Sequence, residues 1–410
     1  MKQLLCLIIA FNFISCTQQT GTKNLKVIDL AGNIGKGRVV NLSEIAESIE
    51  YIPLETNDKS ILGLPKSALC FERGYLYMRQ RSGGFKIFNQ SGEFIKEFNR
   101  YGRGPQEYRF IGRYNIETST NNFLISTNRE VIEYDENGNF IKKVNWFHNE
   151  EIRKLRPATS FIINSNFYLL SLSRNKHGYS YCVTDSLLNI KYFIKQSQKE
   201  QDITSKLTII PALFSSHHYK FRDSVRIFNG YDQNILSVNN SSKLDTCFIL
   251  NYGKYDFRKA TNFNIRDLQK KPYIQRYDKV FESSSYIFMT FNLGSLAHKP
   301  QIMLQTGIAG ERGETVTIPI TYSYFNKKTG EFCYIDQPEF NQKGFVEDFE
   351  GGPAVWPVYI SEDDYMVDII EALQFIKHAQ THKVSEKFKK IADNLKETDN
   401  QILVLVKLKK

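Results

Sequence analysis

The 410-residue sequence lacks the motifs that mark several common enzyme classes. It has only six cysteines and seven histidines, and none of them forms a CxxC motif or a Cys/His cluster, so we expect no metal site. It also lacks a Gly-x-Ser-x-Gly elbow, an H-E-x-x-H motif and the glycine pattern of dinucleotide-binding folds. No cofactor is therefore predicted.

The sequence also lacks a long apolar run and a block of basic residues. Its apolar N-terminal segment, Leu4–Ile14, is shorter than the ~20 apolar residues that a membrane-spanning helix needs. The formal net charge is +10, but charges of both signs are mixed along the chain. A solvated basic surface is the default interpretation, and attraction to anionic lipid or acidic glycans is the alternative. Nucleic acid is not an expected partner.

The first residues resemble the export signal of bacterial lipoproteins. Residues 1–15 contain the apolar segment and end in Ser15, a small residue directly before Cys16, as in a lipobox. We predict a signal peptide over residues 1–15, lipidation of Cys16, and a polar tether over residues 16–26. A cleaved signal followed by a chance cysteine is the alternative. The first acidic residue after Cys16 is Asp29, which favours a periplasm-facing anchor over the cell surface.

An internal repeat indicates the fold. Residues 85–98 recur 46 positions later as residues 131–144, and both copies have the pattern of a strand, a polar turn ending in glycine, and a second strand. Gly92 of the first copy corresponds to Gly138 of the second. A hairpin repeat of this period is typical of propeller blades. We therefore predict an all-β fold, a six-bladed β-propeller over residues 27–410.

The later repeats are less regular. Leu188 stands where the first two turns have glycine, and two long inserts interrupt the pattern. The first insert, residues 252–279, contains a predicted short helix that begins at Ile265, and the second spans residues 295–315. Loops of this length are often functional or mobile, although a tolerated surface insertion is the simpler interpretation.

The C-terminal segment combines helices with a final strand. Residues 372–379 and 385–397 are predicted helices, and Ser385 is a plausible N-cap of the second. Residues 402–408 form a nearly continuous apolar run, which we interpret as a strand of the sixth blade. Pairing of this strand with residues 49–54 would close the ring and leave no exposed edge.

Four stretches together resemble a known family: Ile49–Thr56, Tyr101–Tyr108, Glu350–Pro357 and Asp399–Lys409. Their order and spacing are similar to those of the six-bladed β-propeller lipoproteins of Bacteroidota, which are relatives of NHL-type propellers. The resemblance runs from about residue 27 to the C-terminus. It implies a six-bladed propeller on a lipid anchor, and it implies no settled activity, because most members of that family are uncharacterised.

Two segments carry the candidate ligand-binding residues. In the first, Arg103 and Glu107 lie in a glycine-rich stretch that could hold an anion at a channel mouth. Three more arginines lie nearby in the sequence: Arg100, Arg109 and Arg113. The structural alternative is a crossover between two blades, where glycine supplies backbone freedom. In the second segment, Glu350 and Trp356 could form part of a calcium site or a sugar platform, and a turn beside a buried tryptophan is the alternative.

Two further groups of residue types could carry chemistry. His217 and His218 are adjacent, but neighbours on a strand point to opposite faces, so they could share a metal only from a loop. Four cysteines lie far apart beside apolar strand residues, and we predict buried single thiols rather than disulfides. These cysteines are Cys70, Cys182, Cys247 and Cys333.

These observations favour an exported, lipid-anchored binding or scaffold module of the cell envelope. Propeller loops surround one axis and form a concave site without requiring catalysis. The expected partners are the membrane, through the lipid anchor, and a glycan, a peptide or an envelope protein involved in nutrient uptake. The alternative is a hydrolase or lyase with its active site at the channel mouth. An enzyme would gather perturbed carboxylates or histidines at one opening, whereas a binding module would show aromatic and neutral polar groups.

Overall fold

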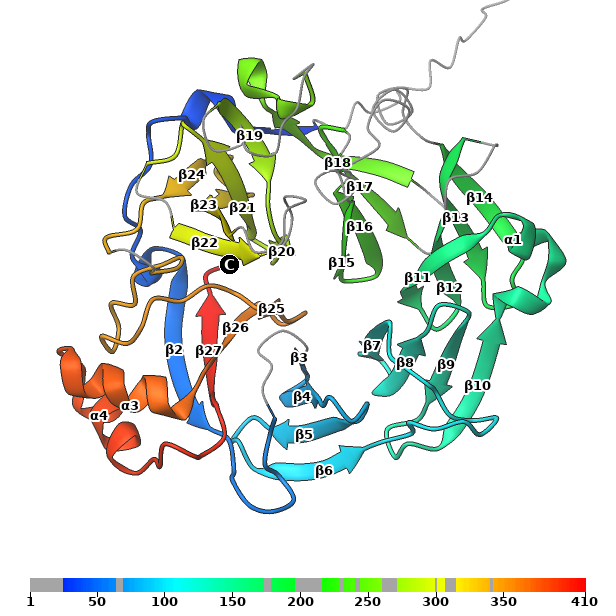
Figure 1. Cartoon of the computed structure of the whole chain (residues 1–410), viewed down its shortest axis with the longest axis horizontal. Coiled ribbons are helices and arrows are strands. Elements are labelled where there is room, and N and C mark those ends of the chain that lie inside the picture. The colour runs from blue at the N-terminus through cyan, green and yellow to red at the C-terminus, as the bar shows by residue number, and fades with distance from the viewer. Residues whose placement is uncertain are drawn as a thin grey trace, which may run out of the picture.

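The computed structural model describes residues 25–63, 69–172, 178–195, 216–228, 230, 232–239, 244–259, 271–298, 301–306, 315–339 and 342–410. The strands in these ranges form six sheets, arranged as blades around a central channel (Figure 1). The predicted six-bladed β-propeller is therefore confirmed. The predicted signal peptide, Cys16 and most of the predicted tether lie outside the described residues.

Blades I to III follow the chain order, and each is a four-stranded antiparallel sheet whose first strand lies nearest the channel (Figure 1). Blade I contains β3 (Leu69–Glu72), β4 (Tyr75–Arg79), β5 (Phe85–Asn89) and β6 (Phe94–Phe98). Blade II contains β7 (Arg113–Glu117), β8 (Asn122–Ser126), β9 (Glu130–Tyr134) and β10 (Phe140–Asn145). Blade III contains β11 (Pro157–Asn164), β12 (Phe167–Leu172), β13 (Tyr179–Asp185) and β14 (Ile190–Lys195).

Blades IV and V carry additional strands. Blade IV contains β15 (His217–Phe221), β16 (Ser224–Phe228), β17 (Asn234–Asn239) and β18 (Leu244–Asn251), with β1 (Lys26–Asp29) paired in parallel outside β18. Blade V contains β20 (Phe281–Glu282), β21 (Tyr286–Gly294), β23 (Thr315–Asn326) and β24 (Phe332–Ile335), lengthened by β19 (Pro272–Arg276) and β22 (Gln301–Thr306). The second predicted insert thus adds strand β22 to blade V. The helix predicted from Ile265 lies outside the described residues.

Blade VI pairs a strand from the N-terminal part of the chain with the C-terminal strand, as predicted. It contains β25 (Tyr359–Ile360), β26 (Tyr365–Ile370), β27 (Ile402–Leu408) and β2 (Ala46–Pro53). Strand β27 lies between β26 and β2, where Val404 is in register with both Asp368 and Tyr51. The apolar side chains of β27 are buried, so closing the ring also buries hydrophobic surface.

Short helices cover the outside of blade VI (Figure 1). These are α3 (Ala372–Thr381) and α4 (Glu386–Asp393), and the hydroxyl of Ser385 accepts the Phe388 N–H at 3.1 Å, which confirms the predicted N-cap. The other helical segments within the described ranges are α1 (Glu150–Lys154), η1 (Ala31–Asn33), η2 (Leu42–Glu44), η3 (Trp146–His148), η5 (Gly253–Tyr255) and η6 (Phe257–Lys259). No helix in the described ranges is both long enough and apolar enough to cross a membrane.

The outer hairpins owe their regularity to one type of turn. Asp135 and Asp185 each accept two backbone N–H groups of their own turn through one carboxylate oxygen. In the first of these turns, Gly138 takes a φ of 85°, and Leu188 takes a φ of 68° at the same position of the second. Blade III therefore keeps the turn although it has lost the glycine, and its boundary is regular.

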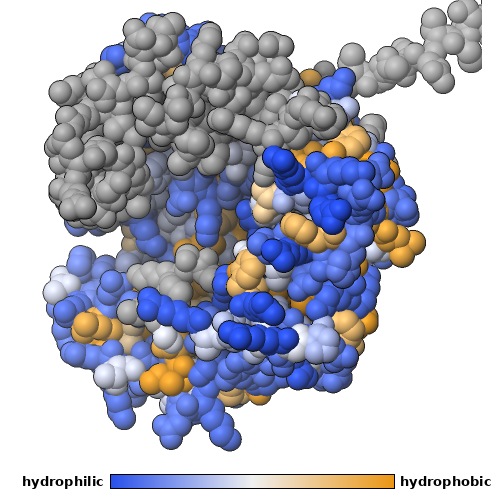
Figure 2. Space-filling model, turned by 45° about the vertical axis from the view of Figure 1, so that its right-hand side comes forward, coloured by the Kyte–Doolittle hydropathy of each residue, from blue (hydrophilic) through white to orange (hydrophobic). Residues whose placement is uncertain are grey.

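The hydrophobic cores lie between neighbouring blades. Phe98 of blade I stacks on Phe123 of blade II with ring centroids 4.2 Å apart, and Tyr134 meets Phe98 edge to face. Among the residues that are coloured in Figure 2, hydrophobic ones are scattered and hydrophilic ones predominate. Packing between the blades holds the inner strands in place around the channel.

Candidate functional site

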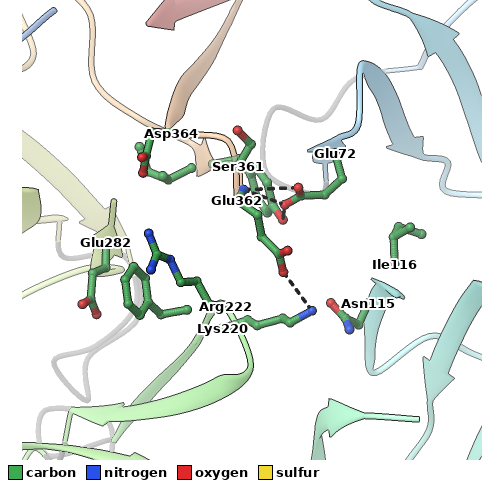
Figure 3. A pocket seen from close by; sticks show the side chains of 12 residues that line it. Glu72, Asn115, Ile116, Lys220, Arg222, Glu282, Ser361, Glu362 and Asp364 are labelled. Carbon is green, nitrogen blue, oxygen red and sulfur yellow. Dashed lines mark hydrogen bonds and ion pairs between the residues drawn. The ribbon is translucent and has the colours of Figure 1, made fainter. Parts of the chain in front are cut away.

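The inner strands of several blades end together at one end of the channel. Strand β3 ends at Glu72, β15 at Phe221, β20 at Glu282 and β25 at Ile360. After each of these strands, the chain turns back into the second strand of the same blade. Their ends enclose a cavity of about 20 Å³, which has room for about one water molecule. We call this cavity the throat (Figure 3). Its lining comes from five blades: Glu72, Asn115, Ile116, Lys220, Phe221, Arg222, Glu282, Tyr359, Ile360, Ser361, Glu362 and Asp364.

Glu72 is a buried carboxylate that forms no ion pair with any of the residues described above. It is 3% exposed, it accepts the Tyr359 hydroxyl at 2.7 Å, and it accepts the backbone N–H of Glu362 at 3.2 Å (Figure 3). Burial raises its pKa to about 7, although these two hydrogen bonds and Lys220 act in the opposite direction. Tyr359 also contacts the thiol of Cys70 at 3.3 Å. Glu72 therefore fixes the start of the β25–β26 turn to blade I.

Glu282 is a buried carboxylate with two cation partners. Its side chain is fully buried, and it accepts Arg226 at 3.1 Å, Lys327 at 2.7 Å and the Tyr219 hydroxyl at 3.0 Å. Burial lowers the pKa of Lys327 against the effect of Glu282. This network joins blades IV and V across the side of the throat.

Three cationic side chains surround the ring of Phe221 at the junction of blades IV and V. Its ring lies 4.2 Å from the Lys327 ammonium, 4.8 Å from the Arg226 guanidinium and 5.4 Å from the Arg222 guanidinium. Of the two carboxylates at the inner-strand ends, only Glu282 faces Arg226 and Lys327. The blade IV and V side of the throat is therefore rich in cations.

The β25–β26 turn carries acidic residues toward these cations. Glu362 pairs with Lys220 at 3.2 Å, and the Asp364 carboxylate accepts the backbone N–H of Ser284 at 2.7 Å. Arg222 donates to the Ser284 hydroxyl at 2.6 Å and remains exposed. These contacts link blade VI to blades IV and V and hold the charged groups in fixed positions.

A wider pocket opens beside the throat on the same end of the channel. It has a volume of about 720 Å³ and shares Arg222, Glu362 and Asp364 with the throat. We call it the mouth pocket; its lining is Phe71, Arg73, Gly74, Gln90, Arg222, Ser284, Ser285, Lys328, Glu362, Asp363, Asp364, Tyr365, Lys407 and Lys410. Five of these side chains are cationic and three are acidic, and two are aromatic. The pocket is large enough for a ligand of drug or disaccharide size.

The predicted residues Arg103 and Glu107 lie at the opposite end of the propeller. They belong to the crossover from β6 to β7, whereas the throat is formed by the turns that follow the inner strands, and antiparallel alternation places these two kinds of connection at opposite ends. Glu107 accepts the Gly104 N–H at 2.7 Å, and a Cβ on Gly102 would lie 1.9 Å from its carboxylate. Glu107 thus fills its own loop, and Arg103 is exposed.

Glu350 lies at the start of α4 beside blade VI, and Trp356 packs against blade V, whereas Arg103 lies in the crossover between blades I and II. The Glu350 carboxylate accepts the Ser385 hydroxyl and lies 3.7 Å from Lys387, so it holds the start of α4. Trp356 is 8% exposed, and its ring packs against Phe345 and Tyr322 in the core. The structure therefore does not bring the four predicted residues into one site, and their ligand-binding roles stay predictions.

The histidine pair begins the inner strand of blade IV, where both side chains are half-buried. His218 bonds the Tyr181 hydroxyl at 2.8 Å and stacks on Phe161, whereas His217 stacks on Tyr219. Burial, with a contribution from Arg276, lowers the pKa of His217 to about 3. Within the described ranges, no three His, Cys, Asp or Glu side chains are placed to hold a metal ion.

The four cysteines are free, as predicted. Cys70, Cys182 and Cys333 are buried, and Cys247 is half-buried, where its sulfur receives the Arg226 guanidinium at 2.9 Å. Burial raises the pKa of the Cys70 thiol well above its ordinary value. These thiols therefore act as small packing groups rather than as reactive nucleophiles.

Sequence reasoning missed the throat, although a local signal for it exists. Each contributing inner strand is short and is followed by a tight turn, for example Arg73-Gly74 after β3 and Arg222-Asp223 after β15. Arg73 and Arg222 have φ values of 53° and 51°, which arginine rarely adopts. Charged residues in these turns could have indicated which residues surround the channel. They could not have indicated which of these residues contact one another.

Fold and pocket together define a six-bladed propeller with a charged pocket at one end of its channel. Residues 25–407 match the family described as a domain of unknown function, DUF4934, and the chain belongs to this family. No functionally curated protein is significantly similar to the chain.

Two solved structures are similar to the chain. A Bacteroides fragilis protein, provisionally described as exported, matches with a TM-score of 0.63 and 17% identity over 94% of this chain and 100% of its own. A DUF4221 family member from Bacteroides vulgatus matches with a TM-score of 0.48 and 12% identity over 89% of this chain and 97% of its own. The first match supports the propeller fold, and the second is too distant to support an argument.

Proposed function

We propose that the protein is a binding or scaffold module of the cell envelope, and that it binds its ligand in the mouth pocket. The observation that carries this proposal is a preformed pocket of about 720 Å³ whose charged groups are held by the protein itself. Arg222 is held by Ser284, and Lys407 donates to the Asp363 carbonyl at 2.7 Å while it lies over Tyr365. Such preorganisation reduces the entropy lost on binding.

The pocket chemistry favours a polar ligand that carries a negative group. Arg222 uses one side of its guanidinium for Ser284, which leaves other donors for a carboxylate or sulfate. Tyr365 offers an aromatic ring on the wall, and rings of this kind stack on sugars or apolar side chains. A glycan or a peptide with an acidic group, handled during nutrient uptake, fits this description.

Binding is tested with purified protein that starts at residue 25. Libraries of acidic and neutral oligosaccharides and peptides are screened, and hits are measured by calorimetry with the wild type and with Arg222→Ala. We expect Arg222→Ala to weaken binding about tenfold or more, because a bidentate contact to the ligand anion is lost. The matched control is Arg153→Ala, an exposed arginine on α1. Equal affinities for all three proteins would place the ligand elsewhere.

We propose that the protein lies on the periplasmic side of a membrane, to which it is anchored by a lipid on Cys16. The support is the apolar segment followed by Ser15 and Cys16, and the absence of acidic residues before Asp29. The kinship with NHL-type lipoprotein propellers belongs to the same proposal. Replacement of Cys16 by Ser should release the protein from the membrane fraction, and retention there would contradict lipid anchoring.

A hydrolase or lyase remains the second candidate, because one observation favours it. Glu72 lines the throat with a pKa raised to about 7, the range that suits a general acid. Yet both of its hydrogen-bonding partners belong to the protein, and the throat holds about one water molecule. Turnover of a screened ligand by the wild type, abolished in Glu72→Gln while binding persists, would favour the enzyme.

A further inference from the structure

A second pocket lies on the crossover end of the propeller, between blades I and II. It has a volume of about 450 Å³ and lies between the β6–β7 crossover, the β8–β9 turn and β10. We call it the crossover pocket. It contains no residue of the throat or of the mouth pocket, so it is a separate site.

Positive charge in the crossover pocket exceeds the negative charge that could neutralise it. Four cations line it, and in the described part of the chain neither Arg103 nor Arg109 has a hydrogen bond or an ion pair through its side chain. Glu107 is occupied by the Gly104 N–H, and Glu130 lies 3.9 Å from Lys143. Two exposed guanidinium groups therefore remain available to an external anion.

An exposed aromatic ring accompanies these arginines. Phe110 follows Arg109 directly, lines the same pocket and is 44% exposed. Arg129 also lines the pocket, and its guanidinium lies over the Phe147 ring at 5.0 Å, a contact that restrains the position of its charge. Guanidinium groups beside an exposed ring suit a ligand that combines an anion with a flat or ring-shaped body.

The shape of the site favours a sugar over a membrane surface. A bilayer is flat and meets protruding residues, whereas these groups surround a recess of about 450 Å³. A pocket of this volume accepts a small number of sugar rings. We propose that the crossover pocket binds an acidic oligosaccharide, with its carboxylate or sulfate on Arg103 and Arg109 and a sugar ring against Phe110.

The test uses defined probes on protein that starts at residue 25. Calorimetry measures a galacturonate tetramer, a sulfated oligosaccharide of equal length and a neutral galactose tetramer, each at low and high salt. We expect the acidic probes to bind, to bind more weakly at high salt, and to bind better than the neutral tetramer. A wild type that binds neither acidic probe, or binds the neutral tetramer equally well, overturns the proposal.

Variants assign the site. Arg103→Glu combined with Arg109→Glu should weaken acidic-probe binding by about tenfold or more, and Phe110→Ala should weaken it less. The control, Lys377→Glu with Lys389→Glu on α3 and α4, makes the same charge change away from the pocket. Equal loss in this control would indicate unspecific attraction and overturn the site. If charge reversal disturbs folding, Arg103→Ala and Arg109→Ala are measured singly instead.

Two further arms separate this site from the other interpretations. A glutamate tetramer that binds more tightly than the sugar acids would make the occupant a peptide, contrary to the proposal. Loss of acidic-sugar binding in Arg222→Ala, with Arg103 and Arg109 variants unaffected, would transfer the ligand to the mouth pocket. That result would support the proposed function and overturn this inference. Loss of binding in the Arg103 and Arg109 variants, with Arg222→Ala unaffected, would support this inference and count against the mouth pocket.

Discussion

Two buried glutamates end inner strands on either side of the β25–β26 turn, and the protein stabilises them by different means. Glu282 of blade V lies against Arg226 and Lys327, so opposite charge offsets its desolvation. Glu72 of blade I has a hydroxyl and a backbone N–H as partners, and burial raises its pKa to about 7. Equivalent positions at inner-strand ends thus have opposite electrostatic surroundings.

The two glutamates have different surroundings because the blades next to them supply different side chains. Blade IV lies beside blade V and supplies Arg226, whereas Lys220, the cation that lowers the pKa of Glu72, is paired with Glu362. The carboxylate on the blade V side of the throat therefore has two cation partners, whereas Glu72 on the blade I side can take up a proton near neutral pH. The throat thus has a cation-rich wall on the blade IV and V side and a titratable carboxyl group on the blade I side.

The largest expected effect comes from removing the paired carboxylate. Glu282→Gln leaves Arg226 and Lys327 buried without a counter-charge, so we expect the free energy of unfolding to fall by about 3–5 kcal/mol. Urea denaturation measures this loss. Glu362→Gln, which removes the partner of the partly exposed Lys220, should cost about 1 kcal/mol or less. Similar losses in both variants would contradict the importance of the Glu282 network.

The second prediction concerns pH and Glu72. Its folded pKa of about 7 exceeds the ordinary value of 4.5, so the folded state binds more protons between these pH values. The stabilisation is present below the unfolded pKa and is lost as the pH rises through the folded pKa. Between about pH 5 and about pH 8, the wild type should lose up to about 3 kcal/mol of unfolding free energy relative to Glu72→Gln. A constant difference between the two proteins would contradict this expectation.

A smaller effect is expected when Glu72 loses its hydroxyl partner. Tyr359→Phe removes the 2.7 Å hydrogen bond and leaves the carboxylate with the backbone donor, which should cost about 1–2 kcal/mol at high pH. Because that bond favours the charged form, the pKa of Glu72 should rise further in the variant. Carbon-13 NMR of labelled glutamate measures the titration, and Tyr365→Phe, a tyrosine of the mouth pocket, is the control. An unchanged Glu72 titration would show that the Tyr359 hydrogen bond does not influence its pKa.

The smallest effect is expected from Lys220→Met. The Lys220–Glu362 pair is partly exposed, so its loss should change the free energy of unfolding by about 1 kcal/mol or less. Lys220 also lowers the pKa of Glu72, so the Glu72 titration should shift upward while the stability at pH 5 hardly changes. A large loss of stability, or a downward shift in the pKa of Glu72, would contradict the placement of Lys220 near both Glu362 and Glu72.

Local features of the chain were predictable because local rules determine them. The turn residues at Asp135 and Gly138, the N-cap at Ser385 and the apolar strand at residues 402–408 all follow from neighbours within a few positions. The closure of the ring by β2 and β27 was also predictable, since an unpaired edge is unfavourable. Leu188 shows the limit of such rules, because the turn persists without its glycine.

The sequence by itself determined the blades, their hairpins and the way the ring closes. Only the tertiary structure decided where the polar residues meet, as with Glu72 and Glu362, which are 290 positions apart. Trp356, a plausible ligand platform in sequence, became a core residue for the same reason. Strand patterns depend on neighbours along the chain, whereas the throat depends on how five blades are placed around one axis. Burial and pairing there arise from that arrangement.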